Sequence, residues 1–236
     1  DGTVFTWENG NKLASVQNSS GTTTYTYNTD GIRTTKTVNG VKHSYVLEGS
    51  RIISERYSNI VIYYIYDESG SPIGLSYKSG NANFENYFFI KNLQGDIINI
   101  YTEQGELAVS YKYDAWGNVE SATAYNGSDI ATLNPFRYRS YYYDTETNLY
   151  YLNKRYYDPQ IGRWINADAA IGQIGNIQGT NMFAYCFNNP VNMSDPTGNW
   201  PQWIKDAANW VDDNIIRPVV NFVKDVAEDI KNYDWN

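Results

Sequence analysis

The sequence has very little of the side-chain chemistry on which most enzymes and metalloproteins depend. It holds one cysteine, Cys186, and one histidine, His43, among 236 residues. A single cysteine excludes an internal disulfide, and we expect a buried structural thiol rather than a reactive one. The histidine lies in the alternating stretch VKHSYV with no nucleophile-elbow motif, so no catalytic triad is expected. Because the sequence has no zinc-binding Cys/His cluster, calcium loop or phosphate-binding glycine motif, we expect neither metal nor cofactor.

Positive charge and long apolar runs are also scarce. Lys and Arg number 18 against 26 Asp and Glu, which gives a formal net charge of −8. Such a chain lacks the basic surface that neutralises phosphates, so nucleic acid is not an expected partner. The apolar runs are far shorter than the roughly 20 residues that cross a bilayer, which argues against a membrane span. The first residues carry no signal segment and read as the middle of a strand pattern, so we expect a piece of a longer chain.

Tyrosine, in contrast, is abundant, with 23 residues, and Thr, Ile and Val are plentiful. Aromatic and β-branched side chains favour strands, so the composition predicts an all-β fold. An aromatic strand end followed by a turn recurs along the chain: FTWENG (5–10), YTYNTDG (25–31), YIYDESG (64–70), IYTEQG (100–105), YKYDAWG (111–117) and RYYDPQIG (155–162). The Asp, Asn or Glu of each phrase begins the turn and the glycine ends it.

These strand-turn-strand units follow one another roughly every 20 residues up to about residue 165, a period typical of stacked arrays. The sequence therefore predicts hairpins lying side by side in one continuous curved sheet, with exposed edges that could pair with another copy. In the last phrase, Tyr156 and Tyr157 are expected on opposite faces of a strand, and Asp158-Pro159 begins the turn.

The phrases resemble the YD-repeat, or rearrangement-hotspot (Rhs), family of bacterial proteins. The resemblance covers residues 1–198 and is strongest at 136–198, which looks like the Rhs repeat-associated core. That segment has the motifs in the family's order: Tyr-Arg, YYD-x-E-T, Leu-Tyr-Tyr, Arg-Tyr-Tyr-Asp-Pro, Gly-Arg-Trp, Asn-Asn-Pro-Val-Asn and Asp-Pro-x-Gly. The resemblance divides the chain into repeats at 1–135, the core at 136–198 and a helical pre-toxin linker at 199–236.

The resemblance implies a structural role. In the family, the repeats form a hollow shell around a variable C-terminal toxin, and the core plugs one end. Containment and delivery of a polymorphic toxin are therefore expected, with the toxin domain of the parent chain and its immunity protein as partners. A secreted or cell-surface location is expected. The alternative is a binding module, whose exposed aromatic side chains contact carbohydrate or a receptor.

The resemblance also implies that the chain cuts itself, as a single event of aspartyl-type autoproteolysis rather than enzymatic turnover. The family uses two aspartates, one from each of two Asp-Pro-x-Gly motifs, as a pair that shares a proton. The second motif is intact as Asp195-Pro196-Thr197-Gly198, whereas the first falls at Asp168, where Ala169 replaces proline. Arg163 is a candidate supporting residue.

Cleavage is expected between about residues 199 and 201, where Asn199 stands in place of the leucine frequent in the family. The separation between Asp168 and Asp195 is longer than usual, and the Gly-rich stretch 172–180 accounts for the extra length, which loops accept at little cost. The alternative reading is that Asp195-Pro196-Thr197-Gly198 is only a turn that closes the core.

The composition changes after residue 199. Apolar residues at three- and four-residue spacing predict two amphipathic helices, with Pro201 and Pro218 in their first turns. Their acidic residues are expected on solvated surfaces rather than around a metal: Asp212, Asp213, Asp225, Glu228 and Asp229. The segment contains no toxin motif.

Overall fold

The computed structural model describes residues 2–167, 183–191 and 193–195, and all of them belong to one compact unit, Asp1–Asn199. Twelve strands make up a first sheet, here called the shell sheet: β1 (Val4–Glu8), β2 (Lys12–Asn18), β3 (Gly21–Tyr27), β4 (Arg33–Val38), β5 (Val41–Glu48), β6 (Arg51–Tyr57), β7 (Ile60–Tyr66), β8 (Pro72–Ser79), β9 (Glu85–Lys91), β10 (Ile97–Thr102), β11 (Leu107–Tyr113) and β12 (Val119–Ala124). The predicted helices at 199–236 lie outside the described residues.

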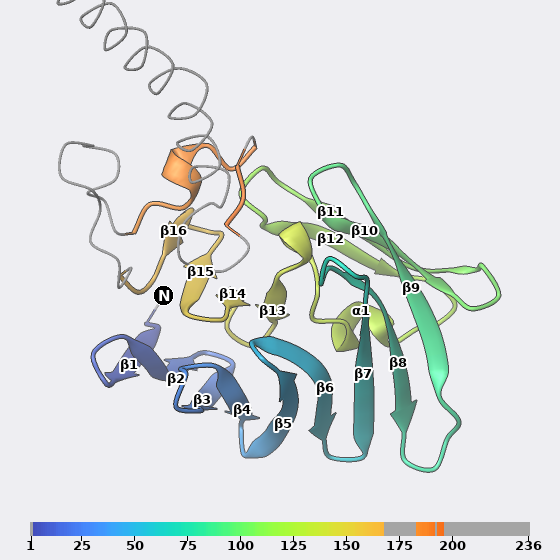
Figure 1. Cartoon of the computed structure of the whole chain (residues 1–236), viewed down its shortest axis with the longest axis horizontal. Helices are drawn as coiled ribbons and strands as arrows, with labels where there is room; N and C mark the ends of the chain where they lie inside the picture. The colour runs from blue at the N-terminus through green and yellow to red at the C-terminus, as the bar shows by residue number, and fades with distance from the viewer. Residues whose placement is uncertain (1, 168–182, 192, 196–236) are drawn as a thin grey trace, which may run out of the picture. The chain divides into compact units, whose positions relative to one another are not determined.

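The shell sheet is an uninterrupted meander. Each strand pairs antiparallel with the next in the sequence, from β1 at one end to β12 at the other. The sheet curls strongly along its length (Figure 1). The predicted all-β fold with a continuous curved sheet is thereby confirmed for residues 4–124.

Two kinds of turn recur between these strands. Asn9-Gly10 and Asn39-Gly40 are tight turns with positive φ at both residues, a conformation that suits Asn-Gly and matches the strand twist. The second kind, here called the YD turn, starts after a tyrosine at four places and after Lys91 at a fifth. In each, the backbone N–H of the first residue bonds to the carbonyl four residues on, and the glycine N–H bonds back to the first residue. YD turns begin at Asn28, Asp67, Asn92, Thr102 and Asp114.

The first side chain of each YD turn also holds the turn closed. The Asp114 Oδ1 atom accepts hydrogen bonds from the backbone N–H groups of Trp116 and Asn118, at 2.8 and 2.9 Å. Equivalent bonds to the fifth residue of the turn form at the other four YD turns. The Asp or Asn of the repeated phrase is therefore a turn-forming residue, as predicted, whereas in IYTEQG the turn begins at Thr102 and not at the predicted Glu103.

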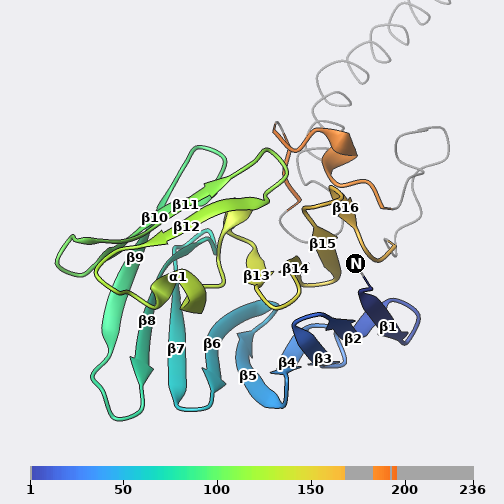
Figure 2. The ribbon, with the colours of Figure 1, turned by 180° about the vertical axis from the view of Figure 1, so that it is seen from behind.

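A second sheet of four antiparallel strands, here called the core sheet, follows β12. It consists of β13 (Tyr142–Asp144), β14 (Leu149–Leu152), β15 (Arg155–Asp158) and β16 (Arg163–Trp164). Short helices among the described residues are α1 (Ile130–Leu133), η1 (Tyr138–Ser140) and η3 (Cys186–Asn188), and α1 contacts β11 and β12 of the shell sheet. The core sheet lies on the inner side of the curved shell sheet (Figures 1 and 2).

The prediction that one sheet runs to about residue 165 is wrong, because the shell sheet ends at Ala124 and the later strands form a second sheet. The chain between the sheets contains α1 and then Asn134-Pro135, and a proline cannot donate a ladder hydrogen bond. The RYYDPQIG phrase therefore belongs to the second sheet. The predicted boundary between 135 and 136 falls in this connection, although both sheets lie in one compact unit and the division into domains stays a prediction.

The core sheet has two apolar faces, and both are covered. Tyr156 faces the shell sheet, where its hydroxyl lies 2.9 Å from that of Tyr27. Tyr157 faces the other way, into a cluster with Trp164 and Tyr185. The prediction that Tyr156 and Tyr157 take opposite faces is confirmed.

A buried ionic cluster joins the two sheets. Arg33 of β4 donates from both terminal nitrogens to Asp144 of β13, and neither side chain is exposed at all. Lys36 Nζ lies 3.0 Å from Asp144 Oδ1 and 2.9 Å from Glu146 Oε1. Since unpaired buried charges are very costly, these partners fix the position of one sheet on the other.

Tyrosine and glutamate extend this junction. Glu55 of β6 accepts hydrogen bonds from the hydroxyls of Tyr64 and Tyr142, both at 2.7 Å. Its other oxygen lies 2.6 Å from His43 Nδ1, and the His43 ring stacks on Tyr57 at 3.9 Å. The single histidine thus has a structural place in the fold.

In the described part of the chain, no helix is long and apolar enough to cross a membrane.

Candidate functional site

Asp195, the first residue of the intact Asp-Pro-x-Gly motif, has its side chain buried in the described structure, with 1 % exposed. Its Oδ2 atom lies 2.8 Å from Arg155 Nη2, and Arg155 is itself buried at the start of β15. The Arg155 guanidinium lies over the ring of Trp164, 3.9 Å from its centroid. An arginine in this setting stays charged, so it favours the ionised form of the Asp195 carboxyl group.

The backbone of Asp195 is held as well as its side chain. Its N–H donates to the hydroxyl oxygen of Tyr141 at 3.0 Å, and that hydroxyl lies 3.1 Å from the hydroxyl of Tyr185. Tyr141 and Tyr185 are both buried. Burial raises the pKa of each, so both hydroxyls remain neutral at physiological pH.

Cys186 lies beside this site, in η3. The thiol is free and buried, and burial raises its pKa to about 12. Because the thiolate is the nucleophilic form, the thiol is held in its unreactive state at neutral pH. The structure therefore confirms the expectation of a buried cysteine.

The structure places the predicted site residues as follows. Asp168 lies outside the described residues, so its pairing with Asp195 stays a prediction. Arg163 lies on β16 opposite Asp158 with its side chain exposed, whereas the arginine in contact with Asp195 is Arg155. The sequence analysis missed Arg155.

A period-two pattern could have pointed to Arg155. Residues two apart on a strand share a face, and Tyr157 faces the aromatic cluster beside Asp195. Arg155 lies on the same face of β15 as Tyr157. The neighbouring basic residue, Lys154, is exposed, so Arg155 is the better candidate for a buried partner of Asp195.

Within the described ranges, no group of three His, Cys, Asp or Glu side chains is placed so that it could hold a metal ion. The site instead offers one carboxylate, one guanidinium and two neutral phenols in an apolar surround. Such an arrangement can hold an ionised carboxylate in a fixed position, and an ionised carboxylate can accept a proton from a group within hydrogen-bond reach.

Comparison with known protein families gives a match to the teneurin YD-shell over residues 50–191. Among curated proteins, the chain is 37% identical over 204 residues to the tRNA nuclease WapA of Bacillus subtilis (strain 168), covering 84% of this chain and 8% of that protein. It is also 32% identical over 168 residues to the double-stranded DNA deaminase toxin A of Burkholderia cenocepacia (strain H111), covering 65% of this chain and 11% of that protein.

Solved structures give the same fold. The structure titled "Crystal Structure of TcdB2-TccC3-TEV" superposes with a TM-score of 0.66 at 23% identity, covering 84% of this chain and 10% of that chain. A second, titled "Crystal Structure of TcdB2-TccC3-Cdc42", gives a TM-score of 0.65 at 22% identity, covering 84% of this chain and 10% of that chain.

The chain thus spans about a tenth of the length of the proteins that it matches. The family match covers more than half of its residues, and it includes the YD turns from Asp67 onward and the core sheet. The chain therefore belongs to the teneurin YD-shell family, as the resemblance to Rhs and YD-repeat proteins predicted.

Proposed function

We propose that this chain forms the closing part of a shell that encloses a toxin domain of the same parent polypeptide. The observation that carries the proposal is the docking of the core sheet onto the inner side of the shell sheet through Arg33 and Asp144. In this proposal, a plug held by buried charges closes the space that the curved sheet surrounds.

The printed names of the relatives support this role. One relative is a tRNA nuclease and another is a double-stranded DNA deaminase toxin, yet both match the same kind of segment. Because the two activities differ, the shared segment does not supply either of them. It serves as a common carrier. A cognate immunity protein and secretion of the parent protein belong to the same proposal.

Enclosure is tested by limited proteolysis of the full-length parent protein. The cargo domain of the intact protein should resist a protease that digests the same domain when it is expressed alone. Arg33→Ala should expose the cargo, because it leaves Asp144 buried without its main partner. Equal digestion of the enclosed and the isolated domain would contradict the proposal.

Self-cleavage after the core is the second part of the proposal. Asp195, paired with Arg155, accepts a proton from a water molecule whose oxygen attacks the carbonyl carbon of a bond between residues 199 and 201, while protonated Asp168 donates its proton to the carbonyl oxygen. As the C–N bond of the resulting gem-diol breaks, Asp195 gives its proton to the leaving amine, and a diol hydroxyl returns a proton to Asp168, which leaves a carboxylic acid and restores the pair. The alternative, a turn that only closes the core, predicts no cut.

Mass spectrometry of the purified parent protein distinguishes these alternatives. The wild-type protein should yield a fragment that ends between residues 199 and 201, and Asp195→Asn should remain uncut. Asp158→Asn is the matched control, because Asp158 is a turn aspartate of the same core and should leave cleavage unchanged. An intact wild-type protein would overturn the self-cleavage proposal and leave the enclosure proposal standing.

Carbohydrate binding is a second candidate function, favoured by exposed aromatic side chains on the shell sheet. Tyr63 and Phe84 are each about two-fifths exposed, and their ring centroids lie 5.6 Å apart. Sugars bind by stacking on such surfaces. Glycan-array screening tests this candidate, with Tyr63→Ser as the variant that should lose any signal and a blank array as the contrary result.

A further inference from the structure

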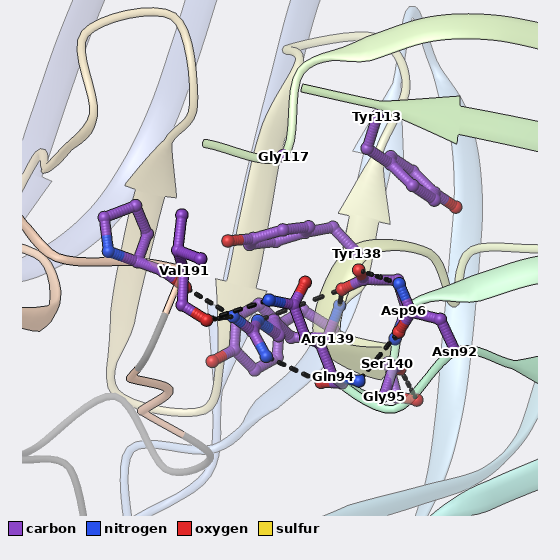
Figure 3. A network of polar contacts seen from close by, with 12 residues as sticks. Asn92, Gln94, Gly95, Asp96, Tyr113, Gly117, Tyr138, Arg139, Ser140 and Val191 are labelled. Atoms are coloured by element: carbon purple, nitrogen blue, oxygen red, sulfur yellow. Dashed lines mark hydrogen bonds and ion pairs between the residues drawn. The ribbon is translucent and has the colours of Figure 1, made fainter. Parts of the chain in front are cut away.

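The backbone shortly before Asp195 is held by a second set of contacts, at Pro190 and Val191. Pro190 and Val191 both offer their carbonyl oxygens to the Nη2 atom of Arg139. Figure 3 shows Val191 beside Arg139. The side-chain amide of Gln94 donates a further hydrogen bond of 2.8 Å to the Val191 oxygen. Two donors from different parts of the chain thus meet at one short stretch of backbone.

Arg139 is itself fixed on several sides. Its Nη1 donates to the Gln94 carbonyl at 2.8 Å, and its backbone N–H donates to Asp96 Oδ1 at 2.9 Å. The guanidinium also lies over the Tyr138 ring, 5.4 Å from its centroid, and the side chain is only 7% exposed. Gln94 and Asp96 belong to the YD turn between β9 and β10, so Arg139 ties the segment before Asp195 to a repeat of the shell sheet.

The backbone at Arg139 adopts an unfavourable conformation to do this. Arg139 has φ 53° and ψ 21°, and Ser140 has φ 60°, both in the left-handed region. Side chains other than glycine keep such a conformation only where surrounding contacts hold it, and such positions gather at functional sites. Here the contacts are the Asp96 bond and a hydrogen bond of 2.8 Å from Ser140 Oγ to the Gly95 carbonyl.

We propose that Arg139 is a positioning residue for self-cleavage, because it fixes the backbone from which Asp195 reaches its place beside Arg155. This inference rests on the self-cleavage proposed above. Val191 precedes Asp195 by only four residues, so the contacts of Arg139 with Pro190 and Val191 limit how far the backbone of Asp195 can shift. Without the first anchor the Asp195 carboxylate samples more positions relative to the bond to be cut.

The test follows the first-order rate of self-cleavage as the full-length parent protein refolds from denaturant. Arg139→Ala should slow cleavage by about 10- to 100-fold, the loss that a misplacement of about 1 Å causes. Arg139→Lys should restore part of the rate, because an ammonium keeps the charge but cannot donate along two fixed directions. Arg56→Ala is the matched control, since Arg56 is an exposed arginine of β6 and should cleave at the wild-type rate.

Gln94→Ala provides a second variant that is expected to fold, because Gln94 is exposed. It removes one donor to Val191 and should slow cleavage by about fivefold, the factor that one net hydrogen bond carries. Near-UV circular dichroism reports the folded fraction of every variant.

The outcomes separate the two proposals. If the wild-type protein stays uncut, self-cleavage is overturned, and the role of Arg139 with it. If the wild type cleaves, Asp195→Asn does not, and both Gln94→Ala and Arg139→Lys cleave at the wild-type rate, the positioning role alone is overturned. A loss of rate in Arg139→Ala that matches its loss of folded protein, with Gln94→Ala unchanged, also overturns it.

Discussion

At the scale of a single residue, the tyrosine of the repeated phrase contributes both packing and a hydrogen bond. Its ring packs on the neighbouring strands, and its hydroxyl donates to a backbone carbonyl of the adjacent strand. This bond recurs from Tyr27 to Leu13, from Tyr66 to Ile52 and from Tyr113 to Ile97, at 2.6 to 2.8 Å. Phenylalanine would supply only the packing, which explains why tyrosine precedes the turn residue in these phrases.

Tyr66→Phe should therefore lower the free energy of unfolding by about 1 kcal/mol, the net worth of one hydrogen bond. Urea unfolding followed by fluorescence measures the change. Tyr63→Phe is the control, because Tyr63 is partly exposed and its hydroxyl makes only a 3.4 Å contact with Arg56. Equal stability losses in the two variants would show that the hydroxyl bond to Ile52 has no special value.

At the scale of the element, the YD turn is a repeated unit with different surroundings at each copy. Gly105 and Gly117 occupy the same place in their turns, with φ of 79° and 93°. A side chain at Gly105 would meet open space, whereas a Cβ atom at Gly117 would lie 2.6 Å from the Tyr138 ring. The turn before β12 thus also serves as a packing surface for the core.

Alanine substitution at these two glycines separates conformation from packing. Gly105→Ala should cost about 1 to 2 kcal/mol of stability, because only the left-handed backbone is penalised. Gly117→Ala should cost about 1 to 3 kcal/mol more, because the Tyr138 ring must also move. Thermal unfolding of both variants measures the difference, and equal losses would mean that the ring yields freely.

The sequence predicted these elements well because their signals are local. An aromatic pair, an Asp or Asn and a glycine within seven residues specify a strand end and its turn without reference to the rest of the chain. The core sheet was harder to place, because only the long connection after Ala124 separates it from the array. Contacts such as Arg155 with Asp195 join residues 40 apart in the chain, and the period-two pattern of β15 indicates the face on which Arg155 lies but not its partner.

At the scale of the whole molecule, buried charges hold the two sheets together. Burial alone would raise the pKa of Asp144, but the positive charges of Arg33 and Lys36 outweigh it and hold that pKa below its usual value. The pKa of Glu55 is lowered too, since its bond to His43 and the charge of Lys36 outweigh burial. Neither acid was identifiable from the sequence as part of an interface, because their partners lie on other strands.

These lowered pKa values predict the pH dependence of stability. A carboxyl group with a depressed folded pKa contributes its full stability above the unfolded pKa of about 4, and loses it as the pH falls through the folded value. The chain should therefore lose stability below about pH 4. Asp144→Asn should lose about 3 to 5 kcal/mol at neutral pH, because it removes the charge that Arg33 and Lys36 require, and should show a shallower acid slope.

Urea unfolding at neutral pH and at several acidic pH values measures both effects. Asp30→Asn is the control, because Asp30 lies exposed in a YD turn and should keep the wild-type stability and slope. If Asp144→Asn kept the full acid slope and the wild-type stability, the ionic cluster would not be what fastens the core sheet.

The strictly sequential strand order of the shell sheet also has a consequence in time. Each new strand pairs with the strand made just before it, so the shell sheet can grow while the ribosome is still extending the chain. Two bonds join the shell sheet to the core sheet across 111 and 129 residues of chain, from Arg33 to Asp144 and from Tyr27 to Tyr156. They can form only after the shell-sheet strands have been made. Assembly then proceeds in one direction along the chain and ends when the core sheet binds to the completed shell sheet.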